Sequence, residues 1–274
     1  MPLQDQKYKY NQTILKVYGQ GNNKKIKVIT MRCLRTAGLD CENDFITARG
    51  TANDMKLDNN ISRARNRIFE LAFCNEWQFF FTGTLNPKLY DRTDLEKFHK
   101  DLTKWLSNQS AKFGTKIKYL LIPELHCDGK SWHIHGFMSG IPSSELKQFQ
   151  IGDTMSAALV EKVSKGDTVY NWLSYQNKFG FCDLEPIKNA EAVSKYITKY
   201  INKNLATSIT ELNAHLFYHS RGLNESQTIK KGTMLADIEP SFTNDYCSVS
   251  WLDYDAELLE NLKHSIVSIR HYSK

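Results

Sequence analysis

The chain has 274 residues, of which 41% are hydrophobic and 24% charged, and this composition is typical of a folded globular protein. No hydrophobic run approaches the ~20 residues that a membrane span needs, and the N-terminal residues resemble neither a signal peptide nor a transit peptide. The 6 cysteines include no C-x-x-C pair, which argues against a zinc ribbon or a disulfide framework. We therefore expect a cytoplasmic protein without a membrane partner.

The charge is distributed unevenly, although its formal sum of +6 is small. Residues 236–260 contain seven acidic residues and no Lys or Arg, so the rest of the chain carries 36 basic against 23 acidic residues. Such a basic body favours a polyanionic partner such as nucleic acid. The acidic C-terminal segment, 236–274, is either a solvated face or a mimic that screens the binding site.

The first 75 residues form a predicted N-terminal extension of strands and one basic helix. Residues 13–18 and 25–30 have the composition of strands, and the Gly-rich and Asn-rich residues between them predict a hairpin loop. A helix is predicted over 61–75, where hydrophobic residues recur at helical spacing. Three arginines crowd its first half, where they could hold phosphates or lie on an exposed face.

Residues 76–235 predict one α+β domain with a five-stranded antiparallel sheet and flanking helices. A helix capped by Asp94 follows the first strand and extends to about residue 109. A tight turn with an Asp-Gly signal joins the second and third strands. The predicted strands lie at 78–85, 116–123, 132–139, 179–187 and 215–220, and a second helix at 189–204.

The hairpin at 116–139 contains a candidate metal site. His133 and His135 are two positions apart on a strand, so both imidazoles lie on one face. If Glu124 pairs with His133, it adds a carboxylate to that face and the set favours Mg²⁺ or Mn²⁺. If the register slips by two residues, His126 takes its place, and three histidines favour zinc. We prefer Glu124.

The helix predicted at 189–204 contains a candidate nucleophile. Tyr196 and Tyr200 are four residues apart and share one helix face, beside a basic stripe of Lys195, Lys199 and Lys203. A tyrosine can attack a phosphodiester and form a covalent phosphotyrosine that conserves the bond energy for later rejoining. Because the phenol has a pKa of ~10, neighbouring cations must stabilise the developing charge, and Lys199 is placed to do so.

Together these motifs resemble the HUH-endonuclease superfamily, and within it the rolling-circle replication initiators of small single-stranded DNA phages and plasmids. The resemblance covers about residues 79–223. Residues 79–87 resemble the first motif, residues 132–136 the His-hydrophobe-His motif, and residues 196–200 the two-tyrosine motif. It implies an RRM-like, ferredoxin-like palm, a Glu124, His133 and His135 metal site, and DNA-binding residues Thr82, Thr84, Asn86, Lys195 and Lys203.

The resemblance implies a metal-dependent initiator that nicks single-stranded or hairpin origin DNA, leaves a 5′-phosphotyrosine and a free 3′-OH, and later rejoins the strand. Residues 124–131 lack the first glycine of a phosphate-binding loop, so we expect no nucleotide cofactor and assign unwinding to a host helicase. A host polymerase then extends the 3′-OH, in the cytoplasm of a bacterial host. The order of the motifs argues against a conjugative relaxase.

Three other functions remain open. A non-catalytic nucleic-acid-binding module on the same fold would use its histidines and tyrosines for stacking or packing. A mobilisation or transposition nuclease of the same superfamily would share the chemistry. A hydrolase of small phosphoesters would need neither the tyrosine pair nor the lysine stripe.

Overall fold

The computed structural model describes residues 7–9, 12–31, 35–37, 54–126, 128–188, 216–244 and 247–267. The chain divides into two units, one made of Gly50–Leu223 and the other of Met1–Arg49 together with Asn224–Lys274. The predicted boundaries at 75/76 and 235/236 differ from this division. The basic helix belongs to the first of these units, and both ends of the chain build the other.

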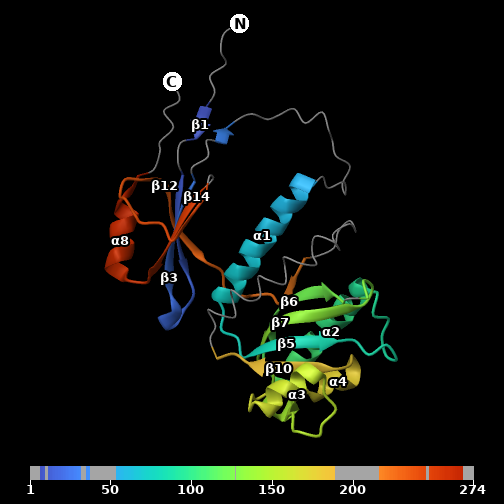
Figure 1. Cartoon of the computed structure of the whole chain (residues 1–274). Helices are drawn as coiled ribbons and strands as arrows, with labels where there is room; N and C mark the ends of the chain where they lie inside the picture. Colours follow the sequence, from blue (N-terminus) through green and yellow to red (C-terminus); the bar gives the residue numbers. More distant parts are fainter. Residues whose placement is uncertain are drawn as a thin grey trace. The chain divides into compact units, whose positions relative to one another are not determined.

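The unit Gly50–Leu223, here the central unit, is built on a seven-stranded antiparallel sheet with the order β11-β6-β7-β5-β10-β9-β8. Figure 1 shows β6, β7, β5 and β10 side by side. Its strands are β5 (Phe79–Thr84), β6 (Lys118–Leu125), β7 (Trp132–Ser139), β8 (Leu146–Gln148), β9 (Tyr170–Trp172), β10 (Cys182–Pro186) and β11 (Tyr218–His219). Its described helices are α1 (Asp54–Phe73), α2 (Leu95–Phe113), α3 (Ala157–Ser164) and α4 (Leu173–Lys178), with a 3-10 turn at Ser143–Glu145.

The α+β class and the antiparallel pairing are confirmed, but the predicted count of five strands is wrong. The two additional strands, β8 and β9, continue the sheet beyond β10. Each has three residues, which is too short for an alternating hydrophobic pattern to stand out in the sequence.

Two of the three helices predicted in this unit, α1 and α2, form where the hydrophobic pattern places them, and the third, at 189–204, lies outside the described residues. The Asp94 side chain caps α2 by accepting a hydrogen bond from the Lys97 backbone N–H at 2.9 Å. The helix packs Phe98, Leu102 and Leu106 against one face of the sheet. Helix α1 packs Ile68 and its neighbours against the other face, where it covers Leu120, Ile122 and Phe137. The second face is therefore hydrophobic at one end of the strands.

The other unit, here the terminal unit, contains a six-stranded antiparallel sheet with the order β13-β14-β3-β2-β12-β15 and helix α8 (Ala256–His264) on one face (Figure 1). The predicted hairpin of β2 and β3 forms its centre, around a 3-10 turn at Gly21–Asn23. Its strands are β2 (Thr13–Tyr18), β3 (Lys25–Met31), β12 (Gln227–Met234), β13 (Phe242–Thr243), β14 (Cys247–Asp253) and β15 (Ile266–Val267); β1 (Lys7–Lys9) and β4 (Arg35–Ala37) pair separately.

Three acidic residues of the C-terminal segment have structural partners. Asp255 caps α8 through the Leu258 backbone N–H at 2.7 Å, and Asp253 forms an ion pair with Lys25 of the partner strand. Glu260 binds Lys263 within the same helix. Whether the acidic segment is a solvated face or a screening mimic stays a prediction from the sequence. Within the described part of the chain, no helix is long and hydrophobic enough to cross a membrane.

Candidate metal and DNA-cleavage site

The β6–β7 hairpin has the predicted register. Glu124 lies opposite His133, and Ile122 lies opposite His135. The turn is held by Asp128, whose carboxylate accepts hydrogen bonds from the backbone N–H groups of Lys130 and Ser131, both at 2.8 Å. A hydrogen bond from the Ser131 side chain contributes most to holding the pKa of Asp128 well below its usual value, and these two backbone hydrogen bonds add to it.

The three predicted ligands lie together on the sheet face that α1 covers only in part. Glu124 Oε2 and His135 Nε2 are 2.9 Å apart, and the His133 and His135 rings have centroids 6.4 Å apart. His126, the alternative ligand, stacks on His133 with a centroid distance of 4.6 Å. Thr84 on the neighbouring strand holds His133 Nδ1 through a hydrogen bond of 3.0 Å, which leaves Nε2 as the ring nitrogen for another ligand.

The electrostatics of the cluster favour the protonation states that metal ligands need. The hydrogen bond from His135 lowers the pKa of Glu124, so its carboxylate is ionised at neutral pH. Burial lowers the pKa of His133 to about 4, and the positive charges of His126, His135 and Arg92 add to this effect. His133 is therefore neutral at pH 7, with a lone pair available for a cation.

The donor types fit a divalent cation, but the side chains do not form a ready ligand set. Among the described residues, no three His, Cys, Asp or Glu side chains are arranged around a common point for a metal ion. Glu124 and His135 bind each other instead. A cation that used both residues would have to replace their hydrogen bond.

Two charged neighbours of this cluster were not predicted. Asp183 on β10 pairs with Thr82, which pairs in turn with His135, so all three lie in one row across the sheet. Burial, together with the charge of Glu185, raises the pKa of Asp183 to about 6. The alternation of Asp183 and Glu185 with hydrophobic residues could have placed them on this face.

Arg92 comes from the loop after β5 and lies near enough to His133 to lower its pKa. Its carbonyl accepts a hydrogen bond from the Trp132 backbone N–H at 3.0 Å, which ties the loop to the start of β7. Its Nε is buried without a hydrogen-bond partner in the described structure. No sequence motif marks this residue, because only the folded loop brings it to the histidines.

The predicted DNA-binding residues of the first motif have different surroundings. Thr82 and Thr84 lie on the face of the histidines, where Thr84 binds His133 and Thr82 binds Asp183. Asn86 accepts a hydrogen bond from the Lys88 backbone N–H at 3.0 Å and so shapes the turn after β5. Gly83 faces the opposite, buried side, where a Cβ would lie 2.6 Å from both Phe81 Cζ and Tyr175 Oη.

The predicted tyrosine motif lies outside the described residues. This applies to Tyr196 and Tyr200 and to Lys195, Lys199 and Lys203. Their assignment as nucleophiles and DNA-binding residues stays a prediction from the sequence.

The fold and the polar face define an α+β protein with an antiparallel sheet that carries imidazoles and carboxylates. Residues 78–205, just under half of the chain, match the family model REP_ORF2-G2P, described as replication-associated protein ORF2/G2P. This match covers both the hairpin and the tyrosine motif, and it supports a Rep-type replication initiator. No curated protein and no solved structure gave a significant match.

Proposed function

We propose that the protein is a replication initiator that nicks and rejoins single-stranded origin DNA through a tyrosine nucleophile. The observation that carries the proposal is the clustering of Glu124, His133 and His135 on one sheet face, inside the segment that matches a replication-associated family. The tyrosine pair lies within the same matched segment. Origin DNA, a host helicase and a host polymerase are the proposed partners, in the cytoplasm of a bacterial host.

In the proposed reaction, the phenolic oxygen of Tyr196 or Tyr200 attacks the scissile phosphorus. The new bond joins this oxygen to the 5′ phosphate, and the bond from phosphorus to the 3′ oxygen breaks. The phenol gives up its proton, and the departing 3′ oxygen takes one to become a free 3′-OH. Rejoining reverses these steps. The second tyrosine allows a regenerated origin to be cut while the first still holds the 5′ end.

Glu124, His133 and His135 would hold a Mg²⁺ or Mn²⁺ ion. When bound, such an ion would supply electrophilic polarisation of the phosphate. The chain's own cations would contribute independently. Lys199 offsets negative charge on the reacting phosphate, and the guanidinium of Arg92, beside His133, is positioned to contact a neighbouring phosphate.

The test is incubation of the protein with a pool of single-stranded oligonucleotides in Mn²⁺, with and without a chelator. We expect a protein–DNA band that survives a denaturing gel and disappears with the chelator. The Tyr196→Phe, Tyr200→Phe double variant should lose the band, whereas Tyr254→Phe, a matched control in the terminal unit, should retain it. Cleavage by the double variant would refute the tyrosine assignment.

The two single variants then resolve the roles of the tyrosines. If both residues react in turn, each single variant retains part of the adduct, and peptide mapping finds DNA on the remaining tyrosine. Complete loss of the adduct in one variant alone would restrict the chemistry to that tyrosine and contradict the alternating scheme.

One observation favours a second candidate, the non-catalytic nucleic-acid-binding module. Glu124 and His135 already bind each other at 2.9 Å, so both are stabilised without a metal. A calorimetric titration of the protein with Mn²⁺ measures metal binding and so separates the two functions. Binding that is lost in Glu124→Gln supports the initiator, and the absence of any binding supports the module.

A further inference from the structure

Thr84, the last residue of β5, lies between two segments that hold its backbone. It pairs with His133 of β7 on one side, and on the other its backbone N–H donates to the Phe181 carbonyl at 2.8 Å. The preceding residue, Gly83, lies against the buried Tyr175, since a Cβ at Gly83 would come within 2.6 Å of Tyr175 Oη. The end of β5 therefore has little room to move.

The side chain of Thr84 is also restricted. Threonine is branched at Cβ, so few rotamers about its first side-chain bond are allowed in a strand. Directly opposite residues of an antiparallel pair have Cβ atoms about 5 Å apart, a separation that a hydroxyl and an imidazole can bridge with one hydrogen bond. Thr84 Oγ1 meets His133 Nδ1 at 3.0 Å. The hydroxyl therefore holds the ring from the neighbouring strand.

This hydrogen bond can decide which nitrogen of His133 carries a proton. A neutral imidazole has one N–H, either at Nδ1 or at Nε2, and a threonine hydroxyl can donate or accept. If the hydroxyl accepts the Nδ1 proton, Nε2 keeps its lone pair. If the hydroxyl donates to Nδ1, Nε2 carries the proton and cannot bind a cation. The direction of one hydrogen bond thus determines whether His133 can serve as a metal ligand.

The other threonine of this strand binds a second member of the same polar cluster. Thr82 lies opposite Asp183 of β10, and the two side chains share a hydrogen bond. The sequence predicts both Thr82 and Thr84 as contacts to DNA, yet each hydroxyl has a partner within the protein. Their hydrogen bonds favour a role in holding the cluster.

We propose that Thr84 is a positioning residue, whose hydroxyl accepts the Nδ1 proton of His133 and so keeps the Nε2 lone pair available for a divalent cation. Histidines that bind metals generally donate their other N–H to an acceptor of this kind, which fixes the tautomer and the orientation of the ring. The inference rests on the proposed metal site. It gives Thr84 a role that acts through His133 and needs no contact with DNA.

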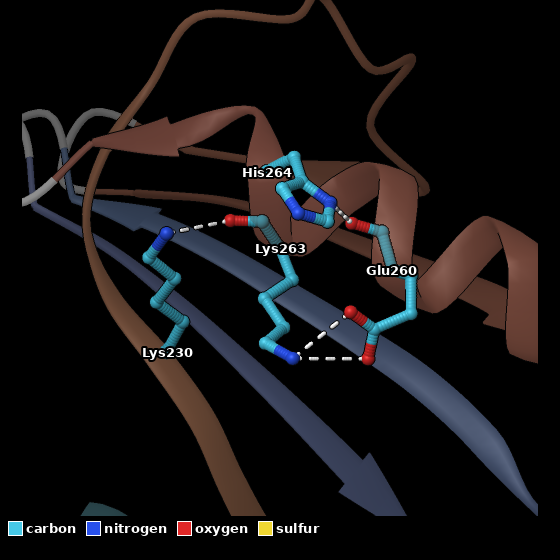
Figure 2. Close-up of polar contacts among 4 residues, drawn as sticks. All are labelled: Lys230, Glu260, Lys263 and His264. Carbon is cyan, nitrogen blue, oxygen red and sulfur yellow. Dashed lines mark hydrogen bonds and ion pairs between the residues drawn. The ribbon is translucent and has the colours of Figure 1, made fainter.

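The first test reads the tautomer of His133 in the metal-free, full-length protein at pH 8, by nitrogen NMR of the histidine side chains. Figure 2 shows a reference in the same chain, because His264 Nδ1 lies 2.7 Å from the Glu260 carbonyl oxygen, which can only accept. We expect an Nδ1 proton on His133 in the wild type and in Thr84→Ser. In Thr84→Val, which keeps the branched shape but lacks the hydroxyl, the proton should shift toward Nε2.

The second test measures the affinity for Mn²⁺ by calorimetry. Thr84→Val should bind Mn²⁺ roughly 10- to 100-fold more weakly than the wild type, the usual cost of removing the partner of a metal-binding histidine. Thr84→Ser should recover most of the affinity, because it keeps the hydroxyl. The matched control is Thr115→Val, which removes an exposed hydroxyl that donates to the Gly140 carbonyl at 3.1 Å. This control should bind Mn²⁺ like the wild type.

An Nε2 proton on His133 in the wild type would overturn the inference, and so would equal Mn²⁺ affinities of the wild type and Thr84→Val. A third contrary result is weaker binding of oligo-dT by Thr84→Val in chelator at unchanged Mn²⁺ affinity, because Thr84 would then contact DNA. These results are separable from the cleavage proposal. A wild type that binds Mn²⁺ but forms no adduct would contradict cleavage alone, whereas a wild type that binds no Mn²⁺ would overturn both.

Discussion

The two sheets of this protein solve the same packing problem and leave different chemistry exposed. In each, a helix with an aspartate cap covers one face, α2 on the seven-stranded sheet and α8 on the six-stranded sheet. The remaining face of the first carries carboxylates and imidazoles at one end of its strands. That of the second carries lysines and aromatic rings. The comparison teaches that two sheets with the same kind of covering helix can present chemically different side chains on their other faces.

The sharpest test of this comparison asks whether the polar face of the central unit carries the cleavage. His135→Ala should lower cleavage at least about 100-fold, more than the loss of a ligand's hydrogen-bond partner costs. Its DNA affinity without metal should stay within about twofold of the wild type, because the proposed role of the imidazole is to hold the metal. Rates of adduct formation at saturating DNA and anisotropy without metal measure the two properties. An equal loss of both would contradict a separate role of His135 in cleavage.

A second test compares two glycines, one in each sheet, that lie close to the backbone of a neighbouring strand. A Cβ on Gly136 would lie 2.1 Å from the Leu120 carbonyl oxygen, and a Cβ on Gly232 would lie 2.2 Å from that of Val267. We expect each alanine variant to lose about 3 kcal/mol of stability, because backbone atoms must move. Urea unfolding measures the loss of stability in each variant, and hydrogen exchange shows which of the two units opens.

The matched control for this pair is Gly129→Ala in the β6–β7 turn. Gly129 has a φ of 67° and no atom within 4 Å of its Cβ position. Its alanine variant should lose only about 1–2 kcal/mol, the cost of a left-handed backbone for a residue with a side chain. A loss as large as that of Gly136→Ala would show that the close approach does not determine stability.

The smallest expected effect concerns pH and distinguishes the polar face of the central unit. The folded pKa of His133, about 4, lies below its unfolded value of 6.5, so its contribution to stability falls as the pH drops through this window. The folded pKa of Asp183, about 6, lies above 3.8, so its contribution rises as the pH drops from 6 to 4. The two effects oppose each other, so the net change in stability between pH 6 and 4 is small.

Asp183→Asn should remove the contribution of Asp183 to the pH dependence of stability and leave that of His133. The variant should be more stable than the wild type at pH 7 and should lose stability more steeply between pH 6 and 4. Urea unfolding in chelator at several pH values measures both slopes. Lys231→Gln in the terminal unit serves as the control and should leave the slope unchanged. Parallel pH curves for Asp183→Asn and the wild type would contradict the raised pKa of Asp183.

Local patterns made much of the fold predictable. The Asp128-Gly129 turn and the alternation around it fixed the β6–β7 hairpin, and with it the pairing of Glu124 and His133. Helical spacing located α1 and α2, and the cap at Asp94 located the start of α2. In each case the decisive contacts join residues close in the sequence.

The unpredicted features depend on contacts between residues far apart in the chain. The pairing of β3 with β14 joins Lys25 to Asp253, and no local pattern encodes that partner. The same holds for Arg92, which reaches His133 through a loop, and for the row of Asp183, Thr82 and His135 across three strands. The sequence therefore identified the ligand candidates of the site but not the charges around them.

In the sequence, Gly50–Leu223 lies between the two segments of the terminal unit, and this order has a consequence for synthesis. Strands β2 and β3 leave the ribosome early, but their neighbours β14 and β12 follow only after the whole of Gly50–Leu223. At 5–20 residues per second, the interval from Met31 to Cys247 lasts roughly 10 to 40 s. During that time both edges of the β2–β3 hairpin are open to wrong partners, including the same hairpin on a neighbouring nascent chain. The central unit can fold in this interval, so the first part of the chain to be made completes its fold last.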